Sequence, residues 1–323
     1  MSFSSAAKNE LCRIPLQKRC CMLAELAAFI NLNGTILFSG NRKVRLYLTT
    51  ENASVARRVF KLIKNLYSFH PEIYMRKNRR LRKSNIYILT VSQPAQAGKI
   101  LKDTHVLYIN EYHNIDIYTG IYPRLVESEC CKRAYLRGAF LSAGSISDPE
   151  KSYHLEITTN NRKYAGELSQ IMQFFDMRPK DVERKGSYVV YLKESENIVR
   201  FLNITGAHGA LLELENIRIR KDMRNNINRI VNCETANLEK TVNAAVRQIE
   251  NIKYIDECIG LNKLSPSLRE IAELRLKYSD ASLRELGQML VPPVGKSGVN
   301  HRLRKLERIA DDLRRKGEGK GEI

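Results

Sequence analysis

The sequence lacks the features of a membrane-spanning protein. Its 323 residues include no tryptophan, only 7% are aromatic, and no apolar run approaches the roughly 18 to 20 residues that cross a bilayer. Residues 1–18 also lack the uninterrupted apolar core of a signal peptide. We therefore expect a cytoplasmic protein with no membrane partner. Because 43% of the residues are hydrophobic, the chain can bury sizeable cores, and wholesale disorder is excluded.

Cysteine is present without the spacing of a common metal or redox motif. None of the seven cysteines lies in a Cys-x-x-Cys pattern. The adjacent pairs, Cys20-Cys21 and Cys130-Cys131, should point to different sides of a helix. We therefore expect seven reduced and mostly buried thiols, no metal site and no cofactor.

Acidic residues are too few to balance the basic ones. The chain has 54 Lys and Arg against 35 Asp and Glu, which gives a formal charge of +19. Such an excess of positive charge indicates what the protein binds and does not indicate its fold. Nucleic acid is the commonest polyanion in a cytoplasm. The alternative is a basic protein without such a partner. Residues 1–128 carry +12, residues 129–212 carry +2 and residues 213–323 carry +5.

An internal repeat organises the first two thirds of the chain. The cysteine pairs recur 110 positions apart, and so do Gly34 and Gly144, which is the signature of a duplication. In each copy an apolar helix ends at a glycine suited to a left-handed C-terminal turn. The segments that follow are predicted as strands at 45–50, 86–91, 154–159 and 188–192 and as helices at 53–67 and 164–175. Each copy thus reads helix, two strands, helix, two strands, helix, and the two α+β halves should form a pseudo-twofold pair.

Small side chains in the repeated helices predict a close helix contact between the halves. Ala27 and Ala28 in one copy, and Gly138 and Ala139 in the other, would let the two backbones approach each other. That contact would bring the two glycine ends together. Residues 26–34 and 136–144 resemble degenerate copies of the nine-residue motif that names the LAGLIDADG homing endonucleases, and the resemblance covers roughly residues 15–210.

The resemblance implies a nuclease-like core without its catalytic acids. In active relatives, the acidic residue before the last glycine of each motif binds divalent metal, and those positions hold Asn33 and Ala143 here. We therefore expect no cleavage. The family's strands form a saddle on duplex DNA, so phosphate contacts are expected from a basic run, with a solvated hairpin as the alternative. This run contains Arg76, Lys77, Arg79, Arg80, Arg82 and Lys83.

After residue 213 the strand signals stop. Residues 216–232 and 238–255 are predicted as two connecting helices. Three short helices follow, starting at Ser265-Pro266, at Ser282 and near Ser297, with a break at residues 291–295. Three helices in this arrangement are typical of a helix-turn-helix domain.

The third of these helices has the composition of a recognition helix. An apolar stripe of Val299, Leu303 and Leu306 leaves a basic face opposite it, which suits the edges of bases in a major groove. Arg308 and Arg314 should meet the DNA backbone or solvent, and a merely hydrated basic face is the alternative. A phosphate loop is rejected, because Leu290 stands where its first glycine belongs. The expected DNA-contacting residues are Lys296, Ser297, Asn300, His301, Arg302, Arg304 and Lys305.

A degenerate LAGLIDADG core followed by a helix-turn-helix resembles the WhiA family of Gram-positive bacterial regulators. Residues 282–309 and the Asn-rich 224–238 carry this resemblance. It implies a sequence-specific transcription regulator of sporulation, cell division and chromosome segregation, located at the nucleoid. The expected domains are two LAGLIDADG-like halves at 1–125 and 126–212, a helical linker at 213–258 and a helix-turn-helix domain at 259–323.

The expected partner is double-stranded DNA. Other transcription regulators or RNA polymerase are further candidates, and we expect a monomeric core, with weak self-association left open. Two alternative functions stay open at this point. One is a metal-dependent endonuclease with relocated acids, and the other is an RNA-binding protein that assists intron folding.

Overall fold

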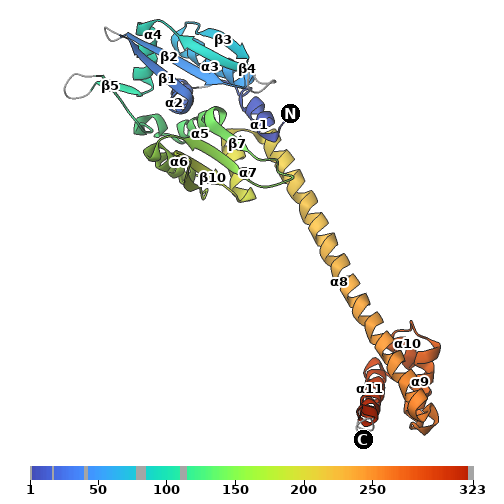
Figure 1. The fold of residues 1–323 in the computed structure, drawn as a ribbon. Helices are drawn as coiled ribbons and strands as arrows, with labels where there is room; N and C mark the ends of the chain where they lie inside the picture. Colours follow the sequence, from blue (N-terminus) through green and yellow to red (C-terminus); the bar gives the residue numbers. More distant parts are fainter. Residues whose placement is uncertain (1, 17, 40–42, 78–84, 110–114, 319–323) are drawn as a thin grey trace. The chain divides into compact units, whose positions relative to one another are not determined.

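The repeat forms two four-stranded antiparallel sheets with the same topology (Figure 1). A computed structural model describes residues 2–16, 18–39, 43–77, 85–109 and 115–318. The strand order is β1-β2-β4-β3 in the first sheet and β7-β8-β10-β9 in the second. The first half contains α2 (Arg19–Asn33), β1 (Gly34–Ser39), β2 (Lys43–Thr50), α3 (Ala53–Tyr67), β3 (Glu72–Lys77), β4 (Asn85–Val91) and α4 (Pro94–Asp103). The second contains α5 (Glu129–Ala143), β7 (Gly144–Ile146), β8 (Leu155–Thr159), α6 (Arg162–Phe174), β9 (Lys180–Arg184), β10 (Ser187–Leu192) and α7 (Ser195–Thr205).

These elements confirm the predicted α+β class and the order of elements in each half. The central strand β2 alternates as a half-buried strand should: Val44, Leu46 and Leu48 are buried, whereas Arg45 between them is exposed. Three further elements were not anticipated from the sequence. They are α1 (Phe3–Leu11), the two-stranded hairpin of β5 (Leu107–Ile109) and β6 (Ile115–Ile117), and the short 3₁₀ helix η1 (Pro123–Val126).

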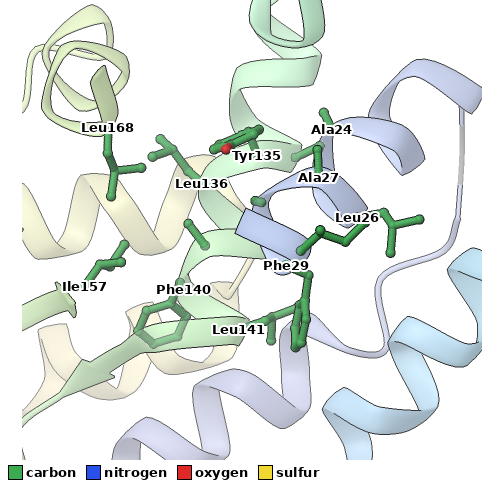
Figure 2. Packing of buried hydrophobic residues seen from close by; sticks show 14 of the residues in the cluster. Ala24, Leu26, Ala27, Phe29, Tyr135, Leu136, Phe140, Leu141, Ile157 and Leu168 are labelled. Carbon is green, nitrogen blue, oxygen red and sulfur yellow. The ribbon is translucent and has the colours of Figure 1, made fainter. Parts of the chain in front are cut away.

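The two halves meet through α2 and α5, as the small side chains predict. A Cβ atom at Gly138 would collide with the backbone carbonyl oxygen of Glu25, so only glycine permits this approach. Figure 2 shows Ala24 and Ala27 of α2 on the side that faces α5, whereas Leu136 and Phe140 of α5 point into the core of the second half. Each helix therefore packs against its own sheet and against the other helix.

The glycines that end these two helices serve a different purpose from the predicted one. Gly34 (φ −80°, ψ 137°) and Gly144 (φ −86°, ψ 154°) are extended, so the predicted left-handed turns are wrong. Each glycine instead begins a strand directly. A Cβ at Gly34 would collide with the Ile30 carbonyl, and one at Gly144 with Phe140. Glycine is needed here because space is short, not because φ is positive.

A buried carboxylate joins the halves next to this contact. Glu25 is 1% exposed and accepts hydrogen bonds from Arg58 Nε of α3 at 2.7 Å and from Arg137 Nε of α5 at 3.0 Å. Arg58 also donates to the Ile14 carbonyl, and Arg137 donates to the Thr205 carbonyl at 3.2 Å. The buried charge is thus paired with two guanidinium groups, one from each half.

The C-terminal third is helical, and it starts with one long helix instead of two. α8 spans His208–Ile259, so the predicted break between residues 232 and 238 is wrong. The segment 233–237 contains neither Gly nor Pro, and nothing in it stops the helix. The chain divides within α8 into two compact units, residues 1–221 and 222–323. Among the described residues, no helix combines the length and the apolar character needed to cross a bilayer.

The second unit has its own small core. After the 3₁₀ helix η2 (Leu261–Lys263), it contains α9 (Pro266–Lys277), α10 (Leu283–Met289) and α11 (Lys296–Glu318), which confirm the three predicted helices. The last turns of α8 contribute Ile252 and Ile255 to this core. Most other buried aliphatic side chains of this core come from α9, α10 and α11: Leu268, Ile271, Ala272, Leu286, Val299, Leu303, Leu306 and Ala310. Leu264 and Leu290 lie just outside these helices.

The cysteines are less buried than expected. Cys21 and Cys131 are buried and Cys12 and Cys130 are half-buried, whereas Cys20, Cys233 and Cys258 are exposed. The prediction of mostly buried thiols is therefore wrong, because two of them lie on the solvent side of α8 and one at the start of α2. The expectation that adjacent cysteines point apart is also wrong: the four Sγ atoms of Cys20, Cys21, Cys130 and Cys131 lie within 4.8 Å of one another.

The Gly138 contact leads to a prediction about stability. Gly138→Ala should lower the free energy of unfolding by about 1–3 kcal/mol, because the new methyl group meets a backbone carbonyl that cannot rotate away. Gly166→Ala is the matched control, since this glycine also lies within a helix and its Cβ would meet nothing within 4 Å. The control should gain roughly 0.5–1 kcal/mol. Denaturant unfolding followed by near-ultraviolet circular dichroism measures both, and equal stabilities would contradict the steric argument.

Candidate nucleic-acid interface

The start of α10 is fixed by a capping box. The Ser282 hydroxyl accepts a hydrogen bond from Glu285 N at 3.3 Å, and the Glu285 carboxylate accepts one from Ser282 N at 2.7 Å. Hydrogen bonding from the Ser282 backbone and side chain lowers the pKa of the Glu285 carboxylate below its ordinary value. The predicted cap at Ser282 is confirmed. Ser265 is likewise the N-cap residue of α9, although its side chain makes no capping hydrogen bond.

The turn between α9 and α10 depends on a buried arginine that sequence reasoning missed. Arg275 is 3% exposed, and its Nη1 donates to the carbonyls of Ser279 at 3.2 Å and Ala281 at 2.7 Å. Burial lowers the pKa of this guanidinium. In the sequence, Arg275 is indistinguishable from a solvated cation on a helix. Only the folded structure shows that it donates hydrogen bonds to two carbonyls of the turn.

The longer turn between α10 and α11 packs back onto α10. Val294 N donates to the Gly287 carbonyl at 2.9 Å, and a Cβ at Gly287 would collide with the Val294 carbonyl oxygen. Val291 N donates to the Glu270 carboxylate of α9 at 3.1 Å. The proline-rich segment is thus anchored to both preceding helices, and these contacts set where α11 begins.

The predicted recognition residues on α11 fall into two groups. Arg302 is half-buried, and its Nη1 lies 3.5 Å from the Ser267 carbonyl of α9, so this side chain is directed toward the domain itself. Asn300 is half-buried at the margin of the outer face. The remaining five are exposed on the outer face of the first three turns: Lys296, Ser297, His301, Arg304 and Lys305.

Arg314, expected at the DNA backbone or in solvent, is partly exposed but also has partners within the domain. Its Nη2 donates to Asn251 Oδ1 of α8 at 2.7 Å, and its guanidinium lies over the Tyr254 ring, 4.9 Å from the centroid. Arg314 therefore fastens α11 to the end of α8. Arg308 is exposed, as expected.

In the first unit, the basic run is only partly described. Arg76 and Lys77 are exposed at the end of β3, whereas Arg79, Arg80, Arg82 and Lys83 lie outside the described residues. The pairing of β1 through β4 places Arg76 on the same outer face as Arg45 of β2. Glu72 lies on this face too and accepts a hydrogen bond from the Tyr74 hydroxyl at 2.6 Å.

The C-terminal ends of α2 and α5 lie together, as predicted, but they present a hydrogen-bond donor and no acidic metal ligand. Asn33 Nδ2 donates to the carbonyls of Thr49 at 3.3 Å and Ser142 at 3.1 Å, and Ala143 offers no side-chain ligand. A pocket of about 380 Å³ here is also lined by Lys8 of α1. Burial lowers the pKa of this ammonium to about 8.

That pocket suits a divalent metal poorly. Mg²⁺ prefers several anionic oxygen ligands, and Glu51 is the one carboxylate among the lining residues, all of which the structure describes. The Asn33 amide and the Lys8 ammonium, both hydrogen-bond donors, line this pocket as well. The geometry therefore offers no pair of acids for the two-metal chemistry of phosphodiester cleavage.

Comparisons with known proteins account for nearly the whole chain. The family described as the WhiA N-terminal LAGLIDADG-like domain matches residues 19–107, the WhiA LAGLIDADG-like domain matches 132–224, and the WhiA C-terminal HTH domain matches 227–310. The probable cell division protein WhiA of Alkaliphilus metalliredigens (strain QYMF) is 54% identical over 98% of this chain and 99% of its own length. The protein of the same name from Alkaliphilus oremlandii (strain OhILAs) is 55% identical over 99% of each chain.

The fold agrees with a solved structure of the same family. The crystal structure of full-length DUF199/WhiA from Thermatoga maritima is 28% identical, with a TM-score of 0.60 over 97% of this chain and 99% of that one. Sequence and fold thus agree on both the paired LAGLIDADG-like halves and the helix-turn-helix. This chain belongs to the WhiA family.

Proposed function

We propose that this protein is a sequence-specific transcription regulator that binds double-stranded DNA through α11. The observation that carries the proposal is the exposed polar face of α11, which stands on a helix-turn-helix frame tied together by Arg275 and the Ser282 capping box. Relatives that match almost end to end are named probable cell division protein WhiA. We therefore place its targets among genes of cell division, chromosome segregation and sporulation, and the protein at the nucleoid.

The side chains on this face match the chemistry of base edges. Arg304 can donate two parallel hydrogen bonds to guanine, and Asn300, one helical turn earlier, can pair with adenine. Lys296 and Lys305 suit phosphates as mobile point charges. Arg302 acts within the domain in this proposal, because it is directed at the Ser267 carbonyl. The base-reading set is thus narrower than the sequence alone predicted.

The core serves as a non-enzymatic scaffold in this proposal. Asn33 donates both of its side-chain hydrogen bonds to carbonyls, Ala143 has no ligand atom, and Lys8 brings a positive charge to the same pocket.

We assign the first and second LAGLIDADG-like halves to residues 1–125 and 126–212, the linker to 213–258 and the DNA-binding domain to 259–323. Other regulators or RNA polymerase would dock on a chain that binds DNA as a monomer or a weak dimer.

The recognition helix gives the first functional prediction. Arg304→Ala and Asn300→Ala should each weaken binding to a mapped target site by about 1–3 kcal/mol and relax base preference at one position. Arg315→Ala is the matched control, because it removes an exposed charge from the far end of the same helix. Gel shifts on sites identified by crosslinking of the intact chain provide the measurement. Unchanged base preference in both variants would overturn the assignment of α11.

The charge of the first half gives a second prediction. Arg76→Ala combined with Lys77→Ala should reduce the slope of log K against log salt by up to about 1.8, since each lost phosphate contact contributes about 0.9. Base preference should not change. Arg218→Ala with Arg220→Ala is the control, because these cations already pair with Glu196 and Glu150. An unaltered salt slope in the β3 variant would mean that this end of the sheet does not contact DNA.

The endonuclease alternative can be tested directly. With Mg²⁺ or Mn²⁺ and a library of genomic fragments, we expect no site-specific cut, because the helix ends lack paired acids. Any specific cleavage that a chelator abolishes would refute the scaffold role. The RNA-binding alternative is tested by competing structured RNA against duplex DNA at matched salt, and preferential displacement by RNA would favour it.

A further inference from the structure

Four cysteines gather where α2 and α5 begin. The Sγ atoms of Cys20, Cys21, Cys130 and Cys131 all lie within 4.8 Å of one another, and this is the one such group of potential metal ligands among the described residues. The cluster lies at the end of the helix pair opposite Asn33 and Ser142. We propose that these four thiolates bind one Zn²⁺ ion, which crosslinks the two halves of the core.

The spacing of the sulfurs suits this ion. With Zn–S bonds of about 2.3 Å, the sulfurs of a tetrahedral site lie about 3.8 Å apart. Side chains that already lie within 4.8 Å reach that spacing by small rotations, without moving the helices. Four sulfur ligands favour Zn²⁺ over Mg²⁺ or Ca²⁺, which prefer oxygen. Since all four tetrahedral positions are filled by protein, the site would be structural, with no open position for a substrate.

Adjacent cysteines converge here because two helices share the site. Cys20 and Cys130 are each the second residue of their helix, and Cys21 and Cys131 are each the third. Each helix contributes one exposed or half-buried thiol and one buried thiol. The close approach that Gly138 permits brings the two helix starts within reach of each other. A single helix would need the usual Cys-x-x-Cys spacing, but a pseudo-twofold pair does not.

Two helix N-termini flank the cluster. Four thiolates around Zn²⁺ carry a net charge of −2, and the cluster lies in the first turns of α2 and α5, at the positive ends of both helix dipoles. Neither N-cap residue, Lys18 or Ser128, makes a side-chain capping hydrogen bond. The Ser128 hydroxyl instead lies 3.3 Å from Cys130 Sγ, where it can donate to sulfur. The partial positive charge of the two helix starts thus favours a metal–thiolate cluster.

A disulfide is the competing use of these residues. It would consume two of the four thiols and leave the symmetric arrangement unexplained. The cluster is also open to metal ions, because Cys20 is exposed and a pocket of about 710 Å³ is lined by Cys21 and Cys130. The four-sulfur geometry therefore favours the metal.

Metal titration of the full chain tests the site. Reduced, metal-free protein should bind one Co²⁺ per chain, with the thiolate-to-metal charge-transfer and visible bands of a tetrahedral sulfur site, and Zn²⁺ should displace it. Cys20→Ser should weaken binding by more than the 10- to 100-fold that loss of a ligand's hydrogen-bond partner costs. A variant with Cys12, Cys233 and Cys258 all changed to Ser keeps the four ligands and should bind as the parent does.

A second measurement guards against misfolding of the variants. Zn²⁺ should raise the thermal midpoint of the parent chain but not that of the Cys20→Ser, Cys130→Ser double variant. Cys20 is exposed and Cys130 is half-buried, so serine should be tolerated at both positions, and far-ultraviolet circular dichroism would verify the fold. A reduced parent chain that binds no stoichiometric Co²⁺ overturns the proposal. So does Co²⁺ binding that survives the double substitution.

Discussion

The close contact between α2 and α5 is the constraint on which the rest of the first unit depends. The Glu25 carbonyl occupies the space that a side chain at Gly138 would fill. Because the helices approach this closely, the first turns bring four sulfurs together and the last turns join Asn33 to the Ser142 carbonyl. Each helix also packs on its own sheet, so this contact sets the relation between the two sheets. A shared interface of this kind lets two small halves bury enough apolar surface to form one core.

The buried Glu25 carboxylate adds directional ion pairs to this helix contact. Glu25 receives Arg58 from its own half and Arg137 from the other, and both arginines use further donors on backbone carbonyls. Such a network contributes modestly to stability when it is complete, but it costs about 3–5 kcal/mol when one partner is lost. It therefore favours the one pairing of halves that satisfies every donor. Hydrophobic packing, which has no direction, does not discriminate in this way.

The two units carry different parts of DNA recognition in our proposal. Net charge is concentrated in residues 1–128, whereas the base-reading chemistry lies on α11. Within the second unit, arginines have separate uses: Arg304 is exposed, Arg275 closes a turn and Arg314 stacks on Tyr254. Arginines that look alike in the sequence therefore differ in how readily they can bind a polyanion. Carbonyl groups and aromatic rings within the domain compete with DNA for some of the guanidinium groups.

Local signals in the sequence were enough to determine many elements. Asn52 caps α3, which spans the predicted residues 53–67, and Ser282 caps α10. The 110-residue repeat predicted both halves and their helix contact, because periodicity, caps and small residues are read locally. The continuity of α8 is also local, because its exposed middle contains no helix-breaking residue. The tertiary structure alone decided the rest: the extended glycines, the roles of Arg275 and Arg314, and the gathered cysteines. These features depend on atoms brought together by packing between distant segments, and no local pattern encodes which neighbour a side chain will meet.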